Sequence, residues 1–350
     1  MIRIPRNPVS FARFLVWAWG TIAGLALGPA MVAADQKTPF ANAMSYLDIP
    51  TVDGSGQQTH PAVQYFPEGW KGYRYWMAMT PYKDSREALE NPSVVASNDN
   101  MRWEVPRGSS NPLVPREAVG HNCDPDLLFH PRTKQLWLTY IYSNDRSASF
   151  LNCLKSSDGV HWSETDLLFS ARPVYSLLSQ SLLYSPSDDK FCMWYVNAGN
   201  KGWNGQDNTI EFRLSSDGIR WSAPERVRFV QPGYLPWHIQ VTYVGSKKEY
   251  WMIAACYPAG KNCFSCTLFF AKSKDRLNWV TYGRPILNAG RHGSWDGGNL
   301  YRSALLHDSG NNRIRMWYSA SRTATRKAEW HIGYTERNYD EFIRVLKGII

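Results

Sequence analysis

Residues 156–162 read SSDGVHW, and this pattern of a serine, an aspartate two positions later and a tryptophan four positions after that recurs along the chain. It returns as SNDNMRW at 97–103, SSDGIRW at 215–221 and SKDRLNW at 273–279. The four leading serines are separated by 59, 59 and 58 residues. A nearly constant period of this length indicates an internal structural repeat.

A second tryptophan keeps a similar interval and reveals a fifth copy of the unit. It lies in aromatic-rich segments such as YRYWMAM and FCMWYVN, at Trp76, Trp137, Trp194, Trp251 and Trp317. The fifth copy lacks the Ser-x-Asp turn and ends in IGYTERNYDEF. Each unit contains apolar and aromatic runs separated by Gly, Asp and Lys turns, with no helical stretch between them. This pattern is typical of short β-strands.

Five copies of such a unit predict an all-β fold, a five-bladed β-propeller with four antiparallel strands per blade. We expect the blades at approximately 59–106, 121–166, 179–226, 238–284 and 299–345. Stacked sheets or a pair of β-sandwiches would use similar strands, but closing the ring removes exposed sheet edges. The segment AMSYLDIPTV at 43–52 is a candidate for the outer strand that the fifth blade lacks.

The repeated turn reads as a structural element. Serine and aspartate side chains can accept hydrogen bonds from nearby backbone amides and so tighten a turn. We therefore expect the motif between the third and fourth strands of a blade, with its tryptophan packed between blades. None of these residues is a catalytic candidate.

The first 34 residues resemble a secretory signal peptide. Arg3, Arg6 and Arg13 precede an apolar run at 14–28, and VAA at 32–34 provides small residues for a signal peptidase. An uncleaved membrane anchor is the rival interpretation, but the run is short for a membrane span. Cleavage would leave residues 35–350 as a single propeller domain, secreted or periplasmic, with no membrane association.

Composition narrows the classes of partner. The chain has 16 Trp and 19 Tyr, and aromatic side chains on a surface are good platforms for sugars. Removing the signal leaves 36 basic and 30 acidic residues, a modest positive charge that suits anionic glycans. Nothing resembles a nucleic-acid module. We expect a monomer whose partner is a carbohydrate.

Six cysteines would be exposed to an oxidising compartment after export. Cys256 and Cys263 flank YPAGKN, a candidate hairpin loop, and could form a disulfide across it. CFSC at 263–266 has Cys-x-x-Cys spacing, but no second such pair completes a zinc site.

A ligand site is expected at the mouth of the propeller channel, where inner strands begin and several loops meet. Alignment of the five units places His60, Asp124, Ser179, His238 and Tyr301 at this mouth. The catalytic candidates are the three carboxylic acids Glu90, Asp124 and Asp296. The substrate-binding candidates are His60, Asn91, Asp126, Trp203, Asp207, His238, Asn299 and Arg302.

The chain resembles the five-bladed propellers of the arabinanase, levansucrase and invertase superfamily, especially glycoside hydrolase family 43 and its uncharacterised relatives. The resemblance rests on blade number and length, the Ser-x-Asp-Gly-x-x-Trp turns and DPDLLF at 124–129. It implies three carboxylates, one at the start of each of the first three inner strands. Asp124 matches the second, but His60 and Ser179 stand near the other two positions.

Two interpretations remain open. The first is a glycoside hydrolase acting on poly- or oligosaccharide at the channel with a non-standard carboxylate set. The second is a carbohydrate-binding propeller that has lost the acid and the base of the family. A variant places an ion, such as a structural Ca²⁺, among His60, Asp124 and His238, although Ca²⁺ prefers oxygen ligands. A sialidase is disfavoured, because it needs six blades and an arginine triad.

Overall fold

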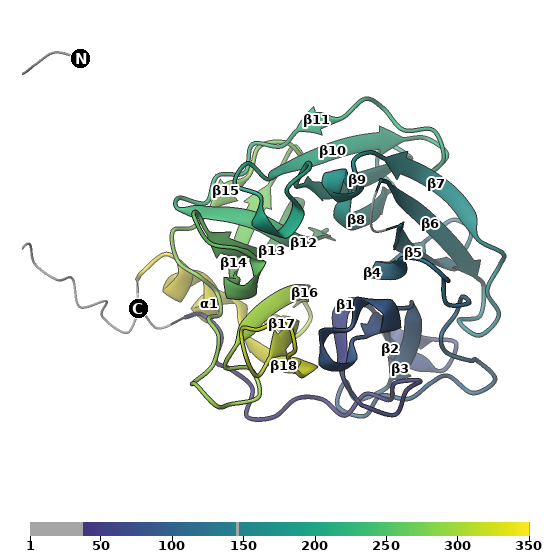
Figure 1. The fold of residues 1–350 in the computed structure, drawn as a ribbon, viewed down its shortest axis with the longest axis horizontal. Helices are drawn as coiled ribbons and strands as arrows, with labels where there is room; N and C mark the ends of the chain where they lie inside the picture. The colour runs from purple at the N-terminus through teal and green to yellow at the C-terminus, as the bar shows by residue number, and fades with distance from the viewer. Residues whose placement is uncertain (1–37, 145–146, 350) are drawn as a thin grey trace, which may run out of the picture. The chain divides into compact units, whose positions relative to one another are not determined.

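The computed structural model describes residues 38–144 and 147–349, in which five antiparallel sheets are arranged in a ring around a central axis (Figure 1). This arrangement confirms the predicted all-β five-bladed propeller. Blade one, in purple, lies beside blade five, in yellow, so the two ends of the described chain close the ring. The expected signal peptide at 1–34 lies outside the described residues.

Blades two, three and four each contain four strands, with the first strand innermost. Blade two comprises β4 (His121–His130), β5 (Gln135–Ser143), β6 (Ser149–Ser156) and β7 (Asp166–Ala171). Blade three comprises β8 (Leu178–Ser185), β9 (Lys190–Asn197), β10 (Thr209–Ser215) and β11 (Glu225–Arg226). Blade four comprises β12 (Tyr234–Val244), β13 (Glu249–Pro258), β14 (Thr267–Ser273) and β15 (Val280–Thr281).

Blades one and five have three strands each instead of the expected four, with the outer position reduced to a single bridge. Blade one comprises β1 (Gln58–Trp70), β2 (Tyr73–Pro81) and β3 (Ser93–Ser97), and blade five comprises β16 (Asn299–Asp308), β17 (Arg313–Ser321) and β18 (Trp330–Asn338). In blade one, Glu104 bridges Ala96. In blade five, Tyr46 bridges Gly333, so the segment 43–52 does occupy the outer position and latches the ring.

The repeated turn forms the hydrogen bonds that its sequence predicts. In blade two, Ser156 Oγ accepts from Gly159 N at 2.8 Å, and Asp158 Oδ1 accepts from Val160 N and His161 N, each at 2.8 Å. The turn packs on the tryptophan of the preceding blade, because a Cβ on Gly159 would lie 2.2 Å from the Trp76 ring. The motif therefore fastens each blade to its neighbour.

Short helical segments complete the described chain. Five 3-10 turns, η1 (Lys83–Ser85), η2 (Glu87–Leu89), η3 (Val174–Ser176), η4 (Gly202–Asn204) and η5 (Cys263–Ser265), lie in the loops between strands. An α-helix, α1 (Tyr339–Leu346), occupies the end of the segment expected to belong to blade five. Asn338 caps it by accepting from Asp340 N and Glu341 N at 3.0 and 3.3 Å. Phe342 of this helix packs on Phe40 and Phe270.

Aromatic side chains dominate the core between the blades. Trp76, Trp194, Trp251 and Trp317 are all completely buried. Cys256 and Cys263 are buried thiols, so the disulfide considered between them does not form. Within the described residues, no helix has the length and apolar character that crossing a membrane requires.

Candidate active site

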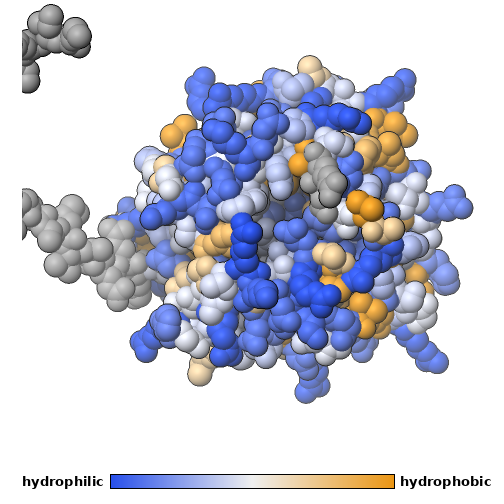
Figure 2. Space-filling view, in the orientation of Figure 1, coloured by the Kyte–Doolittle hydropathy of each residue, from blue (hydrophilic) through white to orange (hydrophobic). Residues whose placement is uncertain are grey.

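A cavity of about 530 Å³ opens at the mouth of the channel. Its wall is formed by the inner strands and by the loops that follow β2, β9, β13 and β17. The space-filling view shows a hollow at the centre of this face, bordered mostly by hydrophilic side chains (Figure 2). Aromatic side chains also line it, namely Tyr82, Tyr175, Trp203, Trp237, Phe264, Tyr301 and Trp330. Aromatic walls with a few polar groups suit a sugar ligand.

Backbone irregularities at the start of the inner strands place the polar groups in this cavity. His60, Asp124 and Ser179 have φ values of 60°, 50° and 49°, in the left-handed region that non-glycine residues rarely adopt. The pairing register of β1, β4 and β8 shifts at these three residues. Such irregularities re-aim side chains at functional sites, and the strain they store is maintained only by the surrounding structure.

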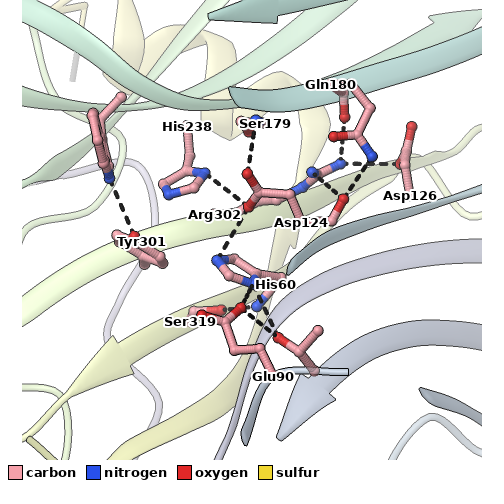
Figure 3. Close-up of polar contacts among 12 residues, drawn as sticks. His60, Glu90, Asp124, Asp126, Ser179, Gln180, His238, Tyr301, Arg302 and Ser319 are labelled. Carbon is pink, nitrogen blue, oxygen red and sulfur yellow. Dashed lines mark hydrogen bonds and ion pairs between the residues drawn. The ribbon is translucent and has the colours of Figure 1, made fainter. Parts of the chain in front are cut away.

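Two histidines and one aspartate converge at the floor of the cavity (Figure 3). His60 Nε2 lies 3.3 Å from Asp124 Oδ1, and His238 Nδ1 lies 3.4 Å from the same oxygen. One ligand atom from each residue lies within 4.8 Å of the other two. All three side chains are buried.

The hydrogen bonds around His60 determine where its proton lies. The Thr80 hydroxyl lies 3.0 Å from His60 Nδ1 and donates its proton to Glu90 Oε2 at 3.3 Å. Thr80 Oγ1 must therefore accept from Nδ1–H, which leaves a bare lone pair on Nε2. That lone pair faces the Asp124 carboxylate.

Burial keeps both imidazoles neutral. Desolvation lowers the pKa of His60 to about 3, although the Asp124 carboxylate opposes the shift. Desolvation, assisted by the positive charge of Arg302, also holds the pKa of His238 well below its usual range. Neutral imidazoles keep the lone pairs that a metal ion requires.

The convergent atoms lack hydrogen-bond partners within the described part of the chain. They are His60 Nε2, Asp124 Oδ1 and both ring nitrogens of His238. Asp124 Oδ2, in contrast, accepts from Ser179 N at 2.8 Å, which fixes the direction of Oδ1. A neutral His238 carries one N–H, so three of these four atoms are acceptors, and buried acceptors held close together are unfavourable unless a cation lies among them. Two imidazole nitrogens and a carboxylate oxygen fit a divalent transition metal better than Ca²⁺.

Six of the eleven residues predicted from the sequence line the cavity: His60, Glu90, Asp124, Trp203, His238 and Asn299. Asn299 uses its side chain structurally, because its Oδ1 accepts from Cys266 N at 2.7 Å and its Nδ2 donates to Cys263 O at 2.9 Å. Five residues lie outside the lining: Asn91, Asp126, Asp207, Asp296 and Arg302.

The proposed catalytic Asp296 lies away from the cavity and holds the N-terminal segment in place. Its carboxylate accepts from Asn42 Nδ2 at 2.8 Å, from the Tyr318 hydroxyl at 2.9 Å and from Ser294 Oγ at 2.8 Å. With these three donors it is a buried structural acceptor. This arrangement does not support its prediction as a catalytic acid or base.

Asp126 and Arg302 form a buried ion pair beneath the site, with 3.2 Å between Oδ1 and the guanidinium (Figure 3). Arg302 also donates to Gln180 O at 2.9 Å, and Asp126 Oδ2 accepts from Leu182 N at 2.7 Å. The pair thus joins blades two, three and five. Both side chains hold the ring together and do not face the cavity.

The remaining two candidates are also outside the cavity, for different reasons. Asn91 is buried and uses its amide to donate to Val114 O at 2.7 Å and to accept from Asn122 at 2.8 Å. Asp207 is exposed on the loop after β9. Neither position contributes to the wall.

Several lining residues were not among the sequence-based site candidates, including His121, Tyr301 and Arg326. Tyr301 had a signal, since the alignment of the inner strands already placed it at the channel mouth. Its ring lies 4.0 Å from that of His238, and its hydroxyl accepts from Trp237 Nε1 at 3.2 Å. Burial raises the pKa of Tyr301 well above its usual value, so the phenol stays protonated.

Comparison with known proteins finds sequence similarity to N-acetylgalactosamine deacetylases. None of the protein-family profiles matches the chain. A type blood N-acetyl-alpha-D-galactosamine deacetylase from Flavonifractor plautii is 32% identical over 391 aligned residues, covering 91% of this chain and 50% of the relative. The crystal structure of an N-acetylgalactosamine deacetylase from F. plautii, in complex with blood group B trisaccharide, is 30% identical with a TM-score of 0.82. That alignment covers 88% of this chain and 98% of the crystallised one.

This chain belongs to the same family of five-bladed propellers as the crystallised F. plautii protein. It spans about half the length of the curated F. plautii relative. Other similar structures share the fold alone. A thermostable family-43 glycoside hydrolase is 14% identical with a TM-score of 0.57, covering 79% of this chain and 89% of its own. A xylan β-1,4-xylosidase from Bacillus halodurans is 12% identical with a TM-score of 0.61, covering 79% and 52%. The predicted resemblance of this chain to the propellers of glycoside hydrolase family 43 is thereby confirmed at the level of fold.

Proposed function

We propose that this protein is a metal-dependent deacetylase that hydrolyses the acetamide of an N-acetylhexosamine in a glycan. The observation that carries the proposal is the convergence of His60 Nε2, Asp124 Oδ1 and His238 on one buried point that faces a sugar-sized cavity. The similarity to an F. plautii N-acetylgalactosamine deacetylase supports the reaction class.

His60, Asp124 and His238 would hold a divalent transition metal. Such an ion supplies a Lewis acid for the amide carbonyl and an activated water as nucleophile. Hydrolysis adds the water oxygen to the acetyl carbon and breaks the C–N bond, releasing acetate and the sugar amine. Thr80 and Glu90 contact Nδ1 of His60, on the opposite side of the ring from Asp124, and would fix the tautomer and orientation of this imidazole.

Tyr301 is placed to assist at the carbonyl oxygen. Its oxygen accepts from the Trp237 indole, so the phenolic proton remains available as a donor toward the cavity. A protonated phenol beside the metal-binding group can stabilise the negative charge that develops on this oxygen. The aromatic walls would bury the sugar ring and the acetyl methyl group.

The geometry favours deacetylation over glycoside hydrolysis, which remains the second candidate. A glycosidase needs two carboxyl groups on either side of the scissile bond, about 5 to 9.5 Å apart with open space between them. Here the His60 ring lies between Glu90 and Asp124, 3.3 Å from each carboxylate. A purely carbohydrate-binding role leaves the unpartnered buried acceptors without a purpose.

The N-terminal sequence supports export of the protein. We place its action outside the cytoplasm on the basis of the signal-like residues 1–34, and we propose that it acts there on a carbohydrate as a monomer. Export would bring the cavity into contact with extracellular or periplasmic glycans.

The test is an assay of released acetate and of released reducing sugar on the same samples. The protein is stripped with a chelator, reloaded with Zn²⁺, Mn²⁺, Co²⁺ or Ca²⁺, and offered oligosaccharides with terminal N-acetylhexosamine. We expect acetate release that depends on a transition metal. Asp207→Asn, an exposed change outside the cavity, serves as the control. Release of reducing sugar without acetate would show glycoside hydrolysis and overturn the proposed deacetylation. Release of neither product would favour a carbohydrate-binding role without catalysis.

A further inference from the structure

The cavity mouth carries an arginine that the reaction itself does not use. Arg326 lies in the loop between β17 and β18 and lines the cavity. Its guanidinium carbon lies 4.5 Å from the centre of the Trp203 ring, which belongs to the loop after β9. The residue is exposed, and within the described residues its guanidinium has no carboxylate partner.

The stacking changes the role expected for Trp203. The centre of the indole lies 5.9 Å from that of the Phe264 ring, with the two planes tilted by 53°, and the Arg326 guanidinium lies over the indole. A tryptophan covered in this way orients a guanidinium instead of offering an open face to a sugar. Arginine stacked on an aromatic ring loses less entropy when it binds an anion, because its planar fork is already positioned.

The loop that carries Arg326 is itself fixed to blade one. Ser85 Oγ accepts from Ala328 N at 3.0 Å and from Trp330 Nε1 at 2.8 Å. Arg322, on the same loop, is paired with Glu329 at 3.2 Å. Arg326 is therefore held at the mouth, and the neighbouring carboxylate of Glu329 is engaged elsewhere.

Lysines and arginines outnumber aspartates and glutamates on the loops around the cavity mouth. Four of the described loops that line the cavity, 82–92, 198–208, 259–266 and 322–329, carry seven lysines and arginines. Apart from the buried Glu90 they carry four aspartates and glutamates. One of these, Glu87, lines the cavity without an arginine or lysine bound to it in the described chain. An excess of positive charge at a cavity mouth draws anionic ligands toward it.

We propose that Arg326 forms a subsite for an anionic group on the sugar next to the N-acetylhexosamine, so that the preferred substrate is an acidic glycan. This inference rests on the proposed deacetylase function and specifies its substrate class. The carboxylate of a uronic acid and a sulfate ester each present a pair of anionic oxygens that an arginine can bind with two parallel hydrogen bonds. Bound there, the anion would anchor the chain while the acetamide reaches the His60, Asp124 and His238 group.

The experiment compares three oligosaccharides of equal length that carry the same terminal N-acetylhexosamine. The adjacent sugar is a uronate, a sulfated hexose or a neutral hexose, and kcat/KM for acetate release is measured with metal-loaded protein. We expect one of the acidic substrates to exceed the neutral one by about tenfold or more, with the preference weakening as salt is added. The acidic substrate that is preferred identifies the anion.

Two variants assign the preference to this side chain. Arg326→Gln should reduce the ratio of acidic to neutral kcat/KM about tenfold, whereas Lys327→Gln, the same charge change on the next residue and outside the lining, should not. Equal activity on all three substrates, or an equal effect of both variants, would overturn the subsite.

Failure of the proposed reaction is distinguishable from failure of the subsite. If no substrate releases acetate, binding of the same three oligosaccharides to wild type and Arg326→Gln is measured by calorimetry. Selective loss of acidic-glycan binding in the variant then supports the subsite without deacetylation. Unchanged binding overturns it.

Discussion

His60 Nε2 lies 3.3 Å from Asp124 Oδ1, yet no hydrogen bond joins them, because the proton of this imidazole is on Nδ1, which faces Thr80. Two buried acceptors therefore face each other, and a nitrogen of His238 completes the group at 3.4 Å from the same oxygen. This relationship distinguishes the site from a glycosidase pair of carboxylates and indicates where a metal would bind.

Asp124→Asn should abolish metal binding while preserving the fold. The asparagine carbonyl can still accept from Ser179 N, but the negative charge and the second oxygen, with both of its lone pairs, are lost. We expect metal affinity to fall by more than about 100-fold, beyond the 10- to 100-fold that outer-shell partners contribute. Metal content by mass spectrometry and thermal unfolding of the metal-free protein measure the two effects. Full metal occupancy in the variant would exclude Asp124 as a ligand.

Thr80→Val should weaken the site without touching a proposed ligand. It removes the nearer acceptor for His60 Nδ1–H and leaves Glu90 Oε2 at 3.3 Å, so the imidazole is held less firmly in this tautomer. Metal affinity should fall about 10- to 100-fold. Thr80→Ser restores the hydroxyl and should restore the affinity, which a merely structural role for the threonine methyl would not predict. Titration with Zn²⁺ followed by calorimetry provides the measurement.

Tyr301→Phe tests the proposed donor to the carbonyl oxygen. Loss of one such donor costs about 100-fold in kcat in comparable sites, with KM little changed, because the interaction strengthens in the transition state. The indole of Trp237 also loses its acceptor, so a decrease of about 1–3 kcal/mol in unfolding free energy should accompany the change. Assays are therefore run well below the melting temperature. An unchanged kcat would remove Tyr301 from the mechanism.

The repeat makes the fold predictable from the sequence, because the period of the Ser-x-Asp-x-x-x-Trp motif counts the blades and places their third turns. The same alignment locates the inner-strand positions. It places His60, Asp124 and His238 together at the channel mouth, because all three lie at the start of inner strands and not on long loops. It also marks Tyr301, whose chemistry becomes evident only from its contacts with Trp237 and His238.

Residues on loops were placed less reliably, since their positions depend on contacts between distant segments: Glu90 and Trp203 line the cavity as expected, but Asp207 and Asp296 do not. Asp296 was expected at the channel mouth because its loop approaches blade five. It is instead bound by Asn42, which is 254 residues away in the chain and directly precedes the segment 43–52. Arg302 lies one position beyond Tyr301 on β16, and the alternation of a strand turns it toward Asp126, away from the cavity. The contact of Arg326 with Trp203 likewise depends on the fold, because the two residues belong to different loops.

The last prediction concerns the contact that closes the ring. Trp317 of blade five is completely buried, and its Nε1 donates to Asn100 Oδ1 of blade one at 2.6 Å. Asn100 has a φ of 67°, and the equivalent positions in blades two and three are Gly159 and Gly218, so glycine fits this backbone without strain. Asn100→Gly thus removes the side chain and its hydrogen bond alone. It should lower the free energy of unfolding by about 1–3 kcal/mol, the cost of an unsatisfied buried donor.

Asn100→Asp, which retains an acceptor oxygen for the indole, is the matched control and should lose less. Both variants are measured by urea unfolding with tryptophan fluorescence as the signal, together with the wild type. If Asn100→Gly unfolds at the same urea concentration as the wild type, the latch between blades one and five depends on the Tyr46–Gly333 bridge and on packing instead of on this hydrogen bond.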